Sequence, residues 1–152
     1  MKIYALSAEE FRRHRTRLVR FLRQHGERRI TKDALRWLER EPIHLCDEEG
    51  GGIWVVVDGN RLVGMAALSD YGRRESVIAV HRDYRQKGVA QELIATMRER
   101  LGKLYGRIAL DNFPSLKMSF AAGFVAFDLI EGPTGKPTFW VGLGDWKRED
   151  VT

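Results

Sequence analysis

The sequence predicts an α/β fold in which helices cover both faces of a mixed, mostly antiparallel sheet. Its 152 residues are enough for one ordinary domain with a hydrophobic core. Amphipathic helix patterns and short β-branched runs follow one another along the chain. No repeat, low-complexity tract or long linker divides it. We therefore expect residues 1–152 to form a single domain.

The beginning of the chain predicts a strand and a helix. Residues 3–6 are typical of a short strand. Ser7 with Glu10 three residues later is a capping box, which predicts a helix that runs to about Gly26. A second, shorter helix is predicted over residues 33–40.

The signals around this second helix are a cap, a stop and a strand-like run. Thr31 can cap its first turn, and Pro42 prevents its continuation. The apolar run 43–46 then predicts a strand that ends at Cys46. Cys46 is the only cysteine, which excludes an intrachain disulfide and a thiolate metal cluster. The acidic residues 47–49 would oppose a thiolate, so we interpret Cys46 as a small buried hydrophobic residue.

The middle of the chain predicts a hairpin, a strand and a helix. Residues 53–57 and 62–68 are strand-like, and Asp58-Gly59-Asn60 between them is a hairpin turn signal. Residues 76–80 predict the next strand. Beyond Gly88, one helix face is marked by apolar residues at helical spacing, namely Val89, Leu93, Ile94, Met97 and Leu101.

The last third of the chain predicts three strands and one more helix. Residues 107–110, 125–130 and 138–143 are strand-like. Pro114 suits the first turn of a helix, and Gly123 suits its left-handed end.

The charge of the chain favours anionic partners without identifying them. The formal net charge is +5 and the isoelectric point is about 9.6. Many arginines fall in the first predicted helix, but an apolar stripe at helical spacing (Phe11, Leu18, Phe21 and Leu22) indicates that they form its solvated face. A nucleic-acid partner is therefore not favoured. No apolar run approaches the roughly 20 residues of a spanning helix, and the amino terminus has no signal-peptide pattern, so no membrane partner and a cytoplasmic location are expected.

The strongest chemical signal lies between Val80 and Ala90. A buried strand is followed by a polar connection and then by Arg85-Gln86-Lys87-Gly88-Val89-Ala90, where an amphipathic helix begins. A helix start carries unpaired N–H groups and a positive dipole end, and Gly88 lets an anion approach the backbone. These features predict a pyrophosphate-binding turn. The motif alone also fits a plain helix start with surface charges, but it is neither a nucleotide P-loop nor a dinucleotide fingerprint.

Residues 78–90 resemble the acetyl-CoA-binding segment of the GNAT (general N-acetyltransferase) superfamily, where a strand and a turn precede Arg/Gln-x-x-Gly-x-Gly/Ala. Downstream, Asn112-Phe113-Pro114-Ser115 followed by Gly123-Phe124 resembles the family's second cofactor segment. The order of elements over about residues 1–143 is similar as well. The resemblance implies a central parallel strand pair that splays apart around the cofactor.

The resemblance also implies the cofactor residues. In this family the pyrophosphate rests on backbone N–H groups, here those of Arg85, Gln86, Lys87, Gly88, Val89 and Ala90. The pantetheine arm lies against the preceding strand like an added strand, here along Ile78, Ala79 and Val80. Asn112 matches the asparagine on the pantetheine side, and Ser115 matches a small residue packed near it. Independently, Asn112, Ser115 and Ser119 form one stripe of a helix beside a core-facing stripe of Leu116 and Phe120. This pattern suits a wall that faces a cofactor; a solvent-facing stripe is the alternative.

Ser119 is a departure from the family pattern. Many members place a tyrosine there that protonates the leaving CoA thiolate. A serine hydroxyl is a far weaker acid than a phenol, so the thiolate would leave unprotonated or through a water held by Ser119. Tyr71 and Tyr84 are possible substitutes for this acid, but nothing in their spacing favours either.

The reaction that the resemblance implies is direct attack of a neutral primary amine on the thioester of acetyl-CoA. A backbone N–H near Val80 would stabilise the oxyanion. Glu75, at the start of the cofactor strand, is the first candidate for the general base, and Asp70 is the second. Both could instead pair with Arg73 or Arg74.

Three functions stay open at this point. The first is an N-acetyltransferase for an amine-bearing acceptor, either a small molecule or a peptide; Trp37 and Trp140 would help to shape its pocket, with core packing as their alternative role. The second is an acyl-CoA-binding or regulatory module that has lost catalysis, and the third is a nucleic-acid-associated protein. The histidines show no metal-ligand spacing, so we expect no metal. A homodimer and the use of longer acyl groups are left open.

Overall fold

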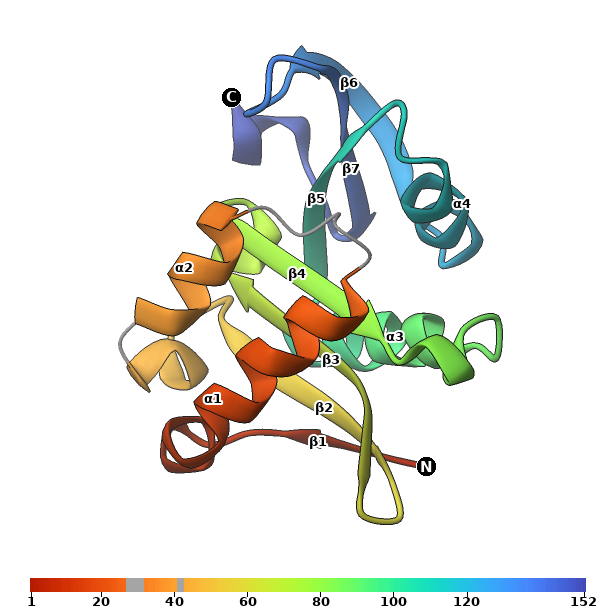
Figure 1. Cartoon of the computed structure of the whole chain (residues 1–152). Coiled ribbons are helices and arrows are strands. Elements are labelled where there is room, and N and C mark those ends of the chain that lie inside the picture. The colour runs from red at the N-terminus through yellow and green to blue at the C-terminus, as the bar shows by residue number, and fades with distance from the viewer. Residues whose placement is uncertain (27–31, 41–42) are drawn as a thin grey trace.

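The computed structural model describes residues 1–26, 32–40 and 43–152 (Figure 1). The helices in these residues are α1 (Ala8–His25), α2 (Lys32–Arg40), α3 (Val89–Leu101) and α4 (Phe113–Ala121). The strands are β1 (Lys2–Ala5), β2 (Gly52–Asp58), β3 (Arg61–Ser69), β4 (Glu75–Val80), β5 (Lys103–Ala109), β6 (Val125–Glu131) and β7 (Pro137–Gly144). Short 3₁₀ helices are η1 (Ile43–Asp47), η2 (Asp70–Gly72), η3 (Arg82–Tyr84) and η4 (Arg148–Val151).

The strands form two antiparallel sheets. One has the order β1-β2-β3-β4 and the other the order β5-β7-β6. Within the described residues no ladder joins β4 to β5, so the predicted sheet is split at this point, which we call the seam. The α/β fold with antiparallel sheets is confirmed, and the expected splay lies between β4 and β5.

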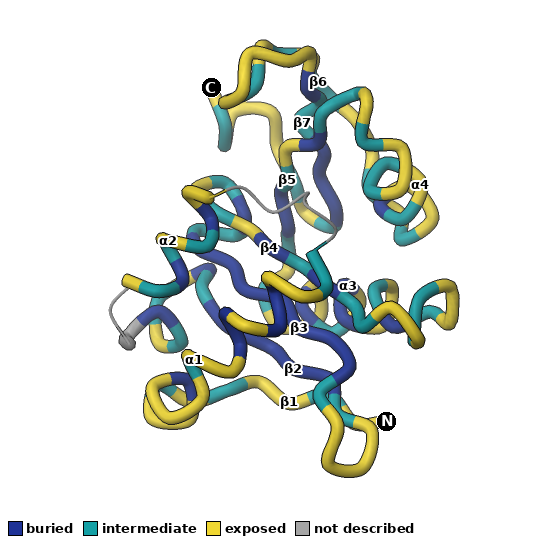
Figure 2. Tube along the Cα trace, viewed as in Figure 1, coloured by how far each residue is buried: buried dark blue, intermediate teal, exposed yellow. Residues whose placement is uncertain are grey.

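Helices cover both faces of the first sheet, as predicted (Figures 1 and 2). Buried side chains of α1 and α2 pack on one face together with Val55, Met65 and Ala79. Buried side chains of α3 pack on the other face, where Val56 and Ala66 point. Successive residues of a strand alternate between the two cores, as the pleat requires.

Local signals in the sequence account for several element boundaries. Ser7 and Glu10 form the predicted capping box, with both reciprocal hydrogen bonds present, and α1 ends at the C-cap Gly26. Asp58 and Arg61 are register partners, so the β2–β3 hairpin turns through the two residues between them. At Gly64 on β3, an added Cβ would lie 3.1 Å from Val89 Cγ1, so this glycine allows α3 to begin close to the sheet.

Two boundary predictions are wrong. Residues 43–46 form part of the 3₁₀ helix η1 and not a strand. Four apolar residues are too few to define a period, and the tight turn places Leu45, which is fully buried, in the core below α1. Strand β5 begins at Lys103, four positions before the predicted start, because the left-handed Gly102 ends α3 and the strand follows at once.

Other predictions concern α4 and residues outside the described part. Asn112 caps α4, but Phe120 is 45% exposed, so it does not belong to a core-facing stripe. Met118 on the neighbouring face packs against the core below α3. Thr31 and Pro42, the predicted cap and stop of α2, lie outside the described residues. None of the described helices combines the length and apolar character needed to span a membrane.

Candidate cofactor and active site

The start of α3 is an open helix N-terminus, which follows β4 after the 3₁₀ helix η3 and a turn. Gly88 is its N-cap with a left-handed φ of 82°, and no side chain in the described residues caps it. The first intrahelical bond at this end is donated by Glu92 N–H to the Gly88 carbonyl at 3.0 Å. The N–H groups of Val89, Ala90 and Gln91 therefore have no partner inside the helix, and they lie at its positive dipole end. This is the geometry that binds an anion.

The turn of residues 85–90, which we call the cradle, is also unobstructed. An added Cβ at Gly88 would have one atom within 4 Å, Gln91 Oε1 at 3.6 Å. Gln86 has a left-handed φ of 61° without being a glycine, which is a strained conformation. Lys87 is exposed, with its ammonium 5.5 Å from the centre of the Tyr84 ring. The cradle thus offers backbone donors and the exposed ammonium of Lys87.

Arg85 differs from the sequence prediction that it supplies mobile charge beside the cradle. Its Nε donates to the Val80 carbonyl at 3.2 Å, and its Nη2 donates to the His25 carbonyl at 2.7 Å. The guanidinium is therefore turned toward the ends of β4 and α1. The sequence could not show this, because His25 lies 60 residues earlier in the chain.

The outer edge of β4 faces the seam. The Val80 carbonyl bonds a side chain, whereas His81 N–H donates to Val63 of β3 at 2.8 Å. Because backbone groups alternate in direction along an antiparallel strand, Ile78 and Val80 point their N–H and C=O groups away from β3. The same alternation turns Ala79 toward its partner Met65. Ile78 and Val80 thus offer the strand edge that an added strand would use, while Ala79 does not.

Helix α4 carries the other predicted cofactor residues. The Asn112 side chain accepts a hydrogen bond from the Ser115 N–H at 3.3 Å, so its amide oxygen serves as the helix cap. Ser115 is half-buried and Ser119 is buried. The stripe of Asn112, Ser115 and Ser119 therefore faces inward and is not the solvent-facing stripe that the sequence left open.

Glu75 lies at the start of β4 and is half-buried. Burial raises the pKa of its carboxyl above the ordinary value, the positive charge of Arg107 opposes this, and Asp33 adds to it. Arg107 itself donates to the Arg74 carbonyl at 3.5 Å, and its guanidinium lies 5.3 Å from the Trp140 ring centre. A carboxyl with a raised pKa at a strand end is suited to proton transfer.

The remaining sequence candidates are engaged elsewhere. Asp70 accepts a hydrogen bond from Arg73 at 2.6 Å, so it forms the ion pair that the sequence allowed as its alternative role. Tyr71 donates to Glu49 at 3.1 Å and Tyr84 donates to Asp58 at 2.6 Å. The accepting carboxylate, together with burial, raises the pKa of each phenol. Neither phenol is therefore set up as a proton donor.

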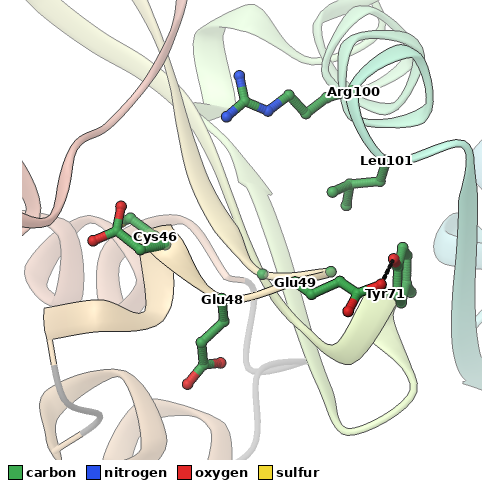
Figure 3. Close-up of a pocket in the computed structure, with 9 residues that line it drawn as sticks. Cys46, Glu48, Glu49, Tyr71, Arg100 and Leu101 are labelled. Atoms are coloured by element: carbon green, nitrogen blue, oxygen red, sulfur yellow. Dashed lines mark hydrogen bonds between the residues drawn. The ribbon is translucent and has the colours of Figure 1, made fainter.

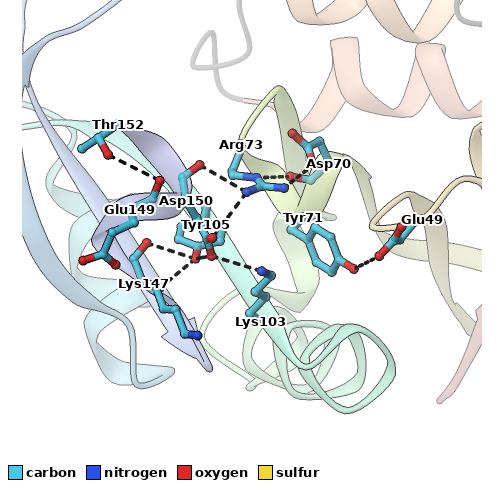
Figure 4. A network of polar contacts seen from close by, with 10 residues as sticks. All are labelled: Glu49, Asp70, Tyr71, Arg73, Lys103, Tyr105, Lys147, Glu149, Asp150 and Thr152. Atoms are coloured by element: carbon cyan, nitrogen blue, oxygen red, sulfur yellow. Dashed lines mark hydrogen bonds and ion pairs between the residues drawn. The ribbon is translucent and has the colours of Figure 1, made fainter.

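A polar network that the sequence did not reveal joins the two sheets at one end of the seam (Figure 4). Asp150 accepts hydrogen bonds from Tyr105 and from Lys103, the latter at 3.0 Å, and the Asp150 carbonyl accepts from Arg73 at 3.2 Å. These hydrogen bonds lower the pKa of Asp150. An added Cβ at Gly72 would lie 2.1 Å from the Tyr105 carbonyl oxygen, so the two backbones touch here. We call this cluster of Gly72, Arg73, Lys103, Tyr105 and Asp150 the sheet junction.

A pocket of about 420 Å³ lies at the far end of α3 (Figure 3). It is lined by residues 46–51, Tyr71, Arg100 and Leu101. Since α3 has 13 residues, the pocket is roughly 20 Å from the cradle. Burial, with Asp47 and Glu10 adding to it, raises the pKa of Cys46 to about 11, so the thiol is not a nucleophile near neutral pH. The described residues contain no group of three metal-binding side chains.

The model of the acetyltransferase (GNAT) family matches residues 24–124, which is more than half of the chain. The chain belongs to this family. No curated protein matches it in sequence. The GNAT match includes β4, the cradle, α3 and α4, and so takes in the predicted cofactor residues of this chain.

Solved structures of GNAT-family acetyltransferases share the fold. A chimera of spermidine N-acetyltransferase SpeG from Vibrio cholerae and hSSAT is 20% identical, with a TM-score of 0.65 over 95% of this chain and 96% of the other. A GNAT acetyltransferase from Streptococcus pneumoniae is 15% identical, with a TM-score of 0.68 over 94% and 98%. The ribosomal-protein-S5-alanine acetyltransferase of Vibrio fischeri is 16% identical, with a TM-score of 0.67 over 95% and 94%. At these identities the likeness concerns the fold.

Proposed function

We propose that this protein is an N-acetyltransferase that transfers the acetyl group of acetyl-CoA to a primary amine, with both substrates bound at once. The observation that carries the proposal is the open N-terminus of α3 at Gly88, which follows an unpaired strand edge on β4. The first feature suits the diphosphate of CoA, and the second suits the amides of its pantetheine arm. Membership of the GNAT family gives the expected cofactor.

The cofactor would lie along the seam. Its diphosphate would accept hydrogen bonds from backbone N–H groups of the cradle, and its arm would extend along β4 toward the strand start. Arg85 already occupies the Val80 carbonyl, so the arm would pair with the Val80 N–H and with the backbone of Ile78. The thioester, at the far end of the arm, would then lie nearer to Glu75 than the diphosphate does.

The chemical step would be direct attack of the amine nitrogen on the thioester carbonyl carbon. An outward backbone N–H of β4, at Ile78 or Val80, would stabilise the oxyanion. As the intermediate collapses, the carbon–sulfur bond breaks and CoA leaves as a thiolate. A thiol pKa of about 8.5 makes this departure feasible without a strong acid. The buried Ser119 would orient a water that protonates the sulfur.

The proton of the ammonium substrate would pass to Glu75, directly or through water. Because its pKa is raised, Glu75 has a proton affinity closer to that of an amine than the proton affinity of an exposed carboxylate is. Arg107 contributes the opposing positive charge, which keeps the carboxylate form accessible. Asp70 is the weaker candidate because Arg73 already holds it.

The acceptor is proposed as an amine-bearing small molecule or peptide. Structural relatives include a spermidine N-acetyltransferase and a ribosomal-protein-S5-alanine acetyltransferase. The acceptors in these two names differ greatly in size. Arg107 of β5 lies close enough to Glu75 for its charge to oppose the raised pKa of that carboxyl, and its guanidinium lies 5.3 Å from the ring centre of Trp140 on β7. Both side chains would border the acceptor site.

Two measurements test the proposal. Calorimetric titration with CoA should give saturable binding that Gly88→Trp removes. Mass spectrometry with acetyl-CoA and a panel of polyamines, amino acids and peptides should show products heavier by one acetyl group. Saturable binding without any turnover across the panel would support the alternative favoured by Ser119, a catalytically impaired acyl-CoA-binding module. Absence of CoA binding would refute both.

A further inference from the structure

The side chain of Arg85 connects three parts of the molecule beneath the cradle. Two of its hydrogen bonds reach the last carbonyl of β4, at Val80, and the carbonyl of His25 at the end of α1. The carbonyls of the last turn of a helix have no intrahelical partner, so the guanidinium satisfies one of them at the negative end of the α1 dipole. Arg85 is itself the first residue of the cradle.

A second set of contacts joins the same two regions. The His25 ring accepts a hydrogen bond at Nδ1 from the Arg82 N–H at 3.4 Å, and its centre lies 4.2 Å from that of His81. His81 in turn accepts at Nδ1 from the Asp83 N–H at 3.1 Å. Burial and the neighbouring charges of His81, Arg82 and Arg85 lower the pKa of His25, so its ring is neutral and able to accept near neutral pH.

We propose that Arg85 is a positioning residue, which fixes the cradle against the end of α1, and that its side chain is not a ligand of the CoA phosphates. His25 is its partner in this role. The inference rests on the proposed cofactor site and adds what holds that site in place.

The physical reason lies in how the cradle binds. Backbone donors cannot be re-aimed by side-chain rotation, so their affinity for a diphosphate depends on a fixed turn. The cradle contains a strained left-handed Gln86, and strained backbone persists only where its surroundings hold it. The Arg85 fork, which donates to two carbonyls at once, can hold it; an ammonium lacks that planar geometry.

The test compares two cations of the same turn. Arg85→Met and Lys87→Met each remove one positive charge, and Arg85→Lys keeps the charge while removing the fork. We expect Arg85→Met and Arg85→Lys to weaken CoA binding by about tenfold each, with the salt dependence of the dissociation constant unchanged. Lys87→Met should weaken CoA binding less and reduce the salt dependence of the dissociation constant, because Lys87 is the exposed cation of the cradle.

The opposite pattern overturns the inference. If Arg85→Lys binds CoA like the wild type and Arg85→Met lowers the salt dependence, Arg85 is a phosphate ligand. His25→Ala should weaken CoA binding by about threefold, with His14→Ala on the exposed face of α1 as its matched control. Equal CoA affinities of His25→Ala and His14→Ala would show that His25 does not help Arg85 to position the cradle.

A measurement without cofactor separates this inference from the proposed function. Hydrogen exchange of the amides of residues 82–90 should be faster in Arg85→Met than in Lys87→Met, with the core of the first sheet protected equally in both. Equal exchange in the cradle would overturn the positioning role even where CoA binds. A wild-type protein that does not bind CoA would refute the cofactor site, while the exchange comparison would still decide the role of Arg85.

Discussion

The two ends of the seam between β4 and β5 are built in opposite ways. At the sheet junction, backbone touches backbone at Gly72 and Tyr105, and Asp150 accepts hydrogen bonds from both sheets. Toward the cradle, the outer backbone groups of β4 pair with no strand in the part of the chain that the structure describes, and a side chain takes the Val80 carbonyl. The protein thus fixes the relative position of its sheets at one end and leaves polar backbone available at the other. Stability and binding should therefore respond to substitutions at different ends.

The largest expected effect is at Gly72, in the closed end. Gly72→Ala places a Cβ 2.1 Å from the Tyr105 carbonyl oxygen at a φ of 93°. Because the obstructing atom is backbone, we expect the free energy of unfolding to fall by roughly 4 kcal/mol. Urea denaturation measures this. Gly59→Ala is the control, since its φ of 61° is also left-handed but no atom lies within 4 Å; it should cost roughly 1 kcal/mol. Equal losses in the two variants would mean that the sheets do not meet at Gly72.

The next effect is at Gly88, in the open end. Gly88→Trp has space for its Cβ, and its left-handed φ of 82° should cost only about 1 kcal/mol, so the fold should survive while the indole covers the helix N-terminus. We expect CoA affinity to fall by about 1,000-fold, which corresponds to ~4 kcal/mol of binding free energy. Gly102→Trp, at the other end of α3 with a nearly equal φ of 84°, should bind CoA normally. Calorimetric titration compares them, and similar affinities would place the cofactor away from the cradle.

Glu75 lies at the start of β4, close in sequence to the closed end, and should affect catalysis more than stability. Glu75→Gln is expected to lower kcat/KM by about 100-fold, at the lower end of general-base effects. The wild-type rate should rise with pH through a pKa above the ordinary 4.5 of a glutamate, and the variant should lose this limb. A raised pKa means that the carboxyl of the folded protein holds its proton more tightly than that of the unfolded protein. Ionisation of this carboxyl above the raised pKa therefore destabilises the fold. The variant should therefore be at least as stable as the wild type near neutral pH. A variant with an unchanged pH–rate profile would exclude Glu75 as the base.

Asp150 tests the electrostatic part of the sheet junction. Asp150→Asn should lower the free energy of unfolding by about 1 kcal/mol near neutral pH. The control is Glu9→Gln, which breaks an exposed ion pair with Arg13 and should lower the free energy of unfolding by less than about 0.5 kcal/mol. The lowered pKa of Asp150 gives a stabilisation that is present above 3.8 and is lost as the pH falls through the lowered value. Stability curves of wild type and variant should therefore converge in that acidic range. A constant gap down to the lowest pH would contradict an ionic role.

Ser119 is expected to give the smallest effect. Ser119→Ala should lower kcat by about threefold, the loss of one hydrogen bond to a water that protonates the leaving thiolate. Steady-state kinetics with saturating acetyl-CoA measures it. A loss of 100-fold or more would instead identify the hydroxyl as the direct proton donor.

The sequence predicted what short-range signals encode. The capping box at Ser7, the hairpin turn at Gly59 and the helix start at Gly88 are each decided by a few neighbouring residues, and all three are confirmed. The strand predicted over residues 43–46 is wrong because four residues cannot distinguish a strand from a single helical turn. The strand edge of β4 and the open start of α3, on which the proposed cofactor site rests, could likewise be predicted from local patterns.

Long-range side-chain contacts could not be predicted. Arg85 reaches His25 across 60 residues, and Tyr105 reaches Asp150 across 45 residues. Nothing in either local pattern distinguishes such a side chain from an exposed one. The sequence proposes Glu75 as the base from its place at the start of the strand, but the burial that raises its pKa depends on packing between separate elements.

The position of Asp150 outside both sheets has a practical consequence. It lies in η4, and yet its carboxylate and carbonyl tie Lys103 and Tyr105 of one sheet to Arg73 beside the other. A proteolytic cut between β7 and η4 would therefore loosen the two sheets from each other without breaking a strand of either.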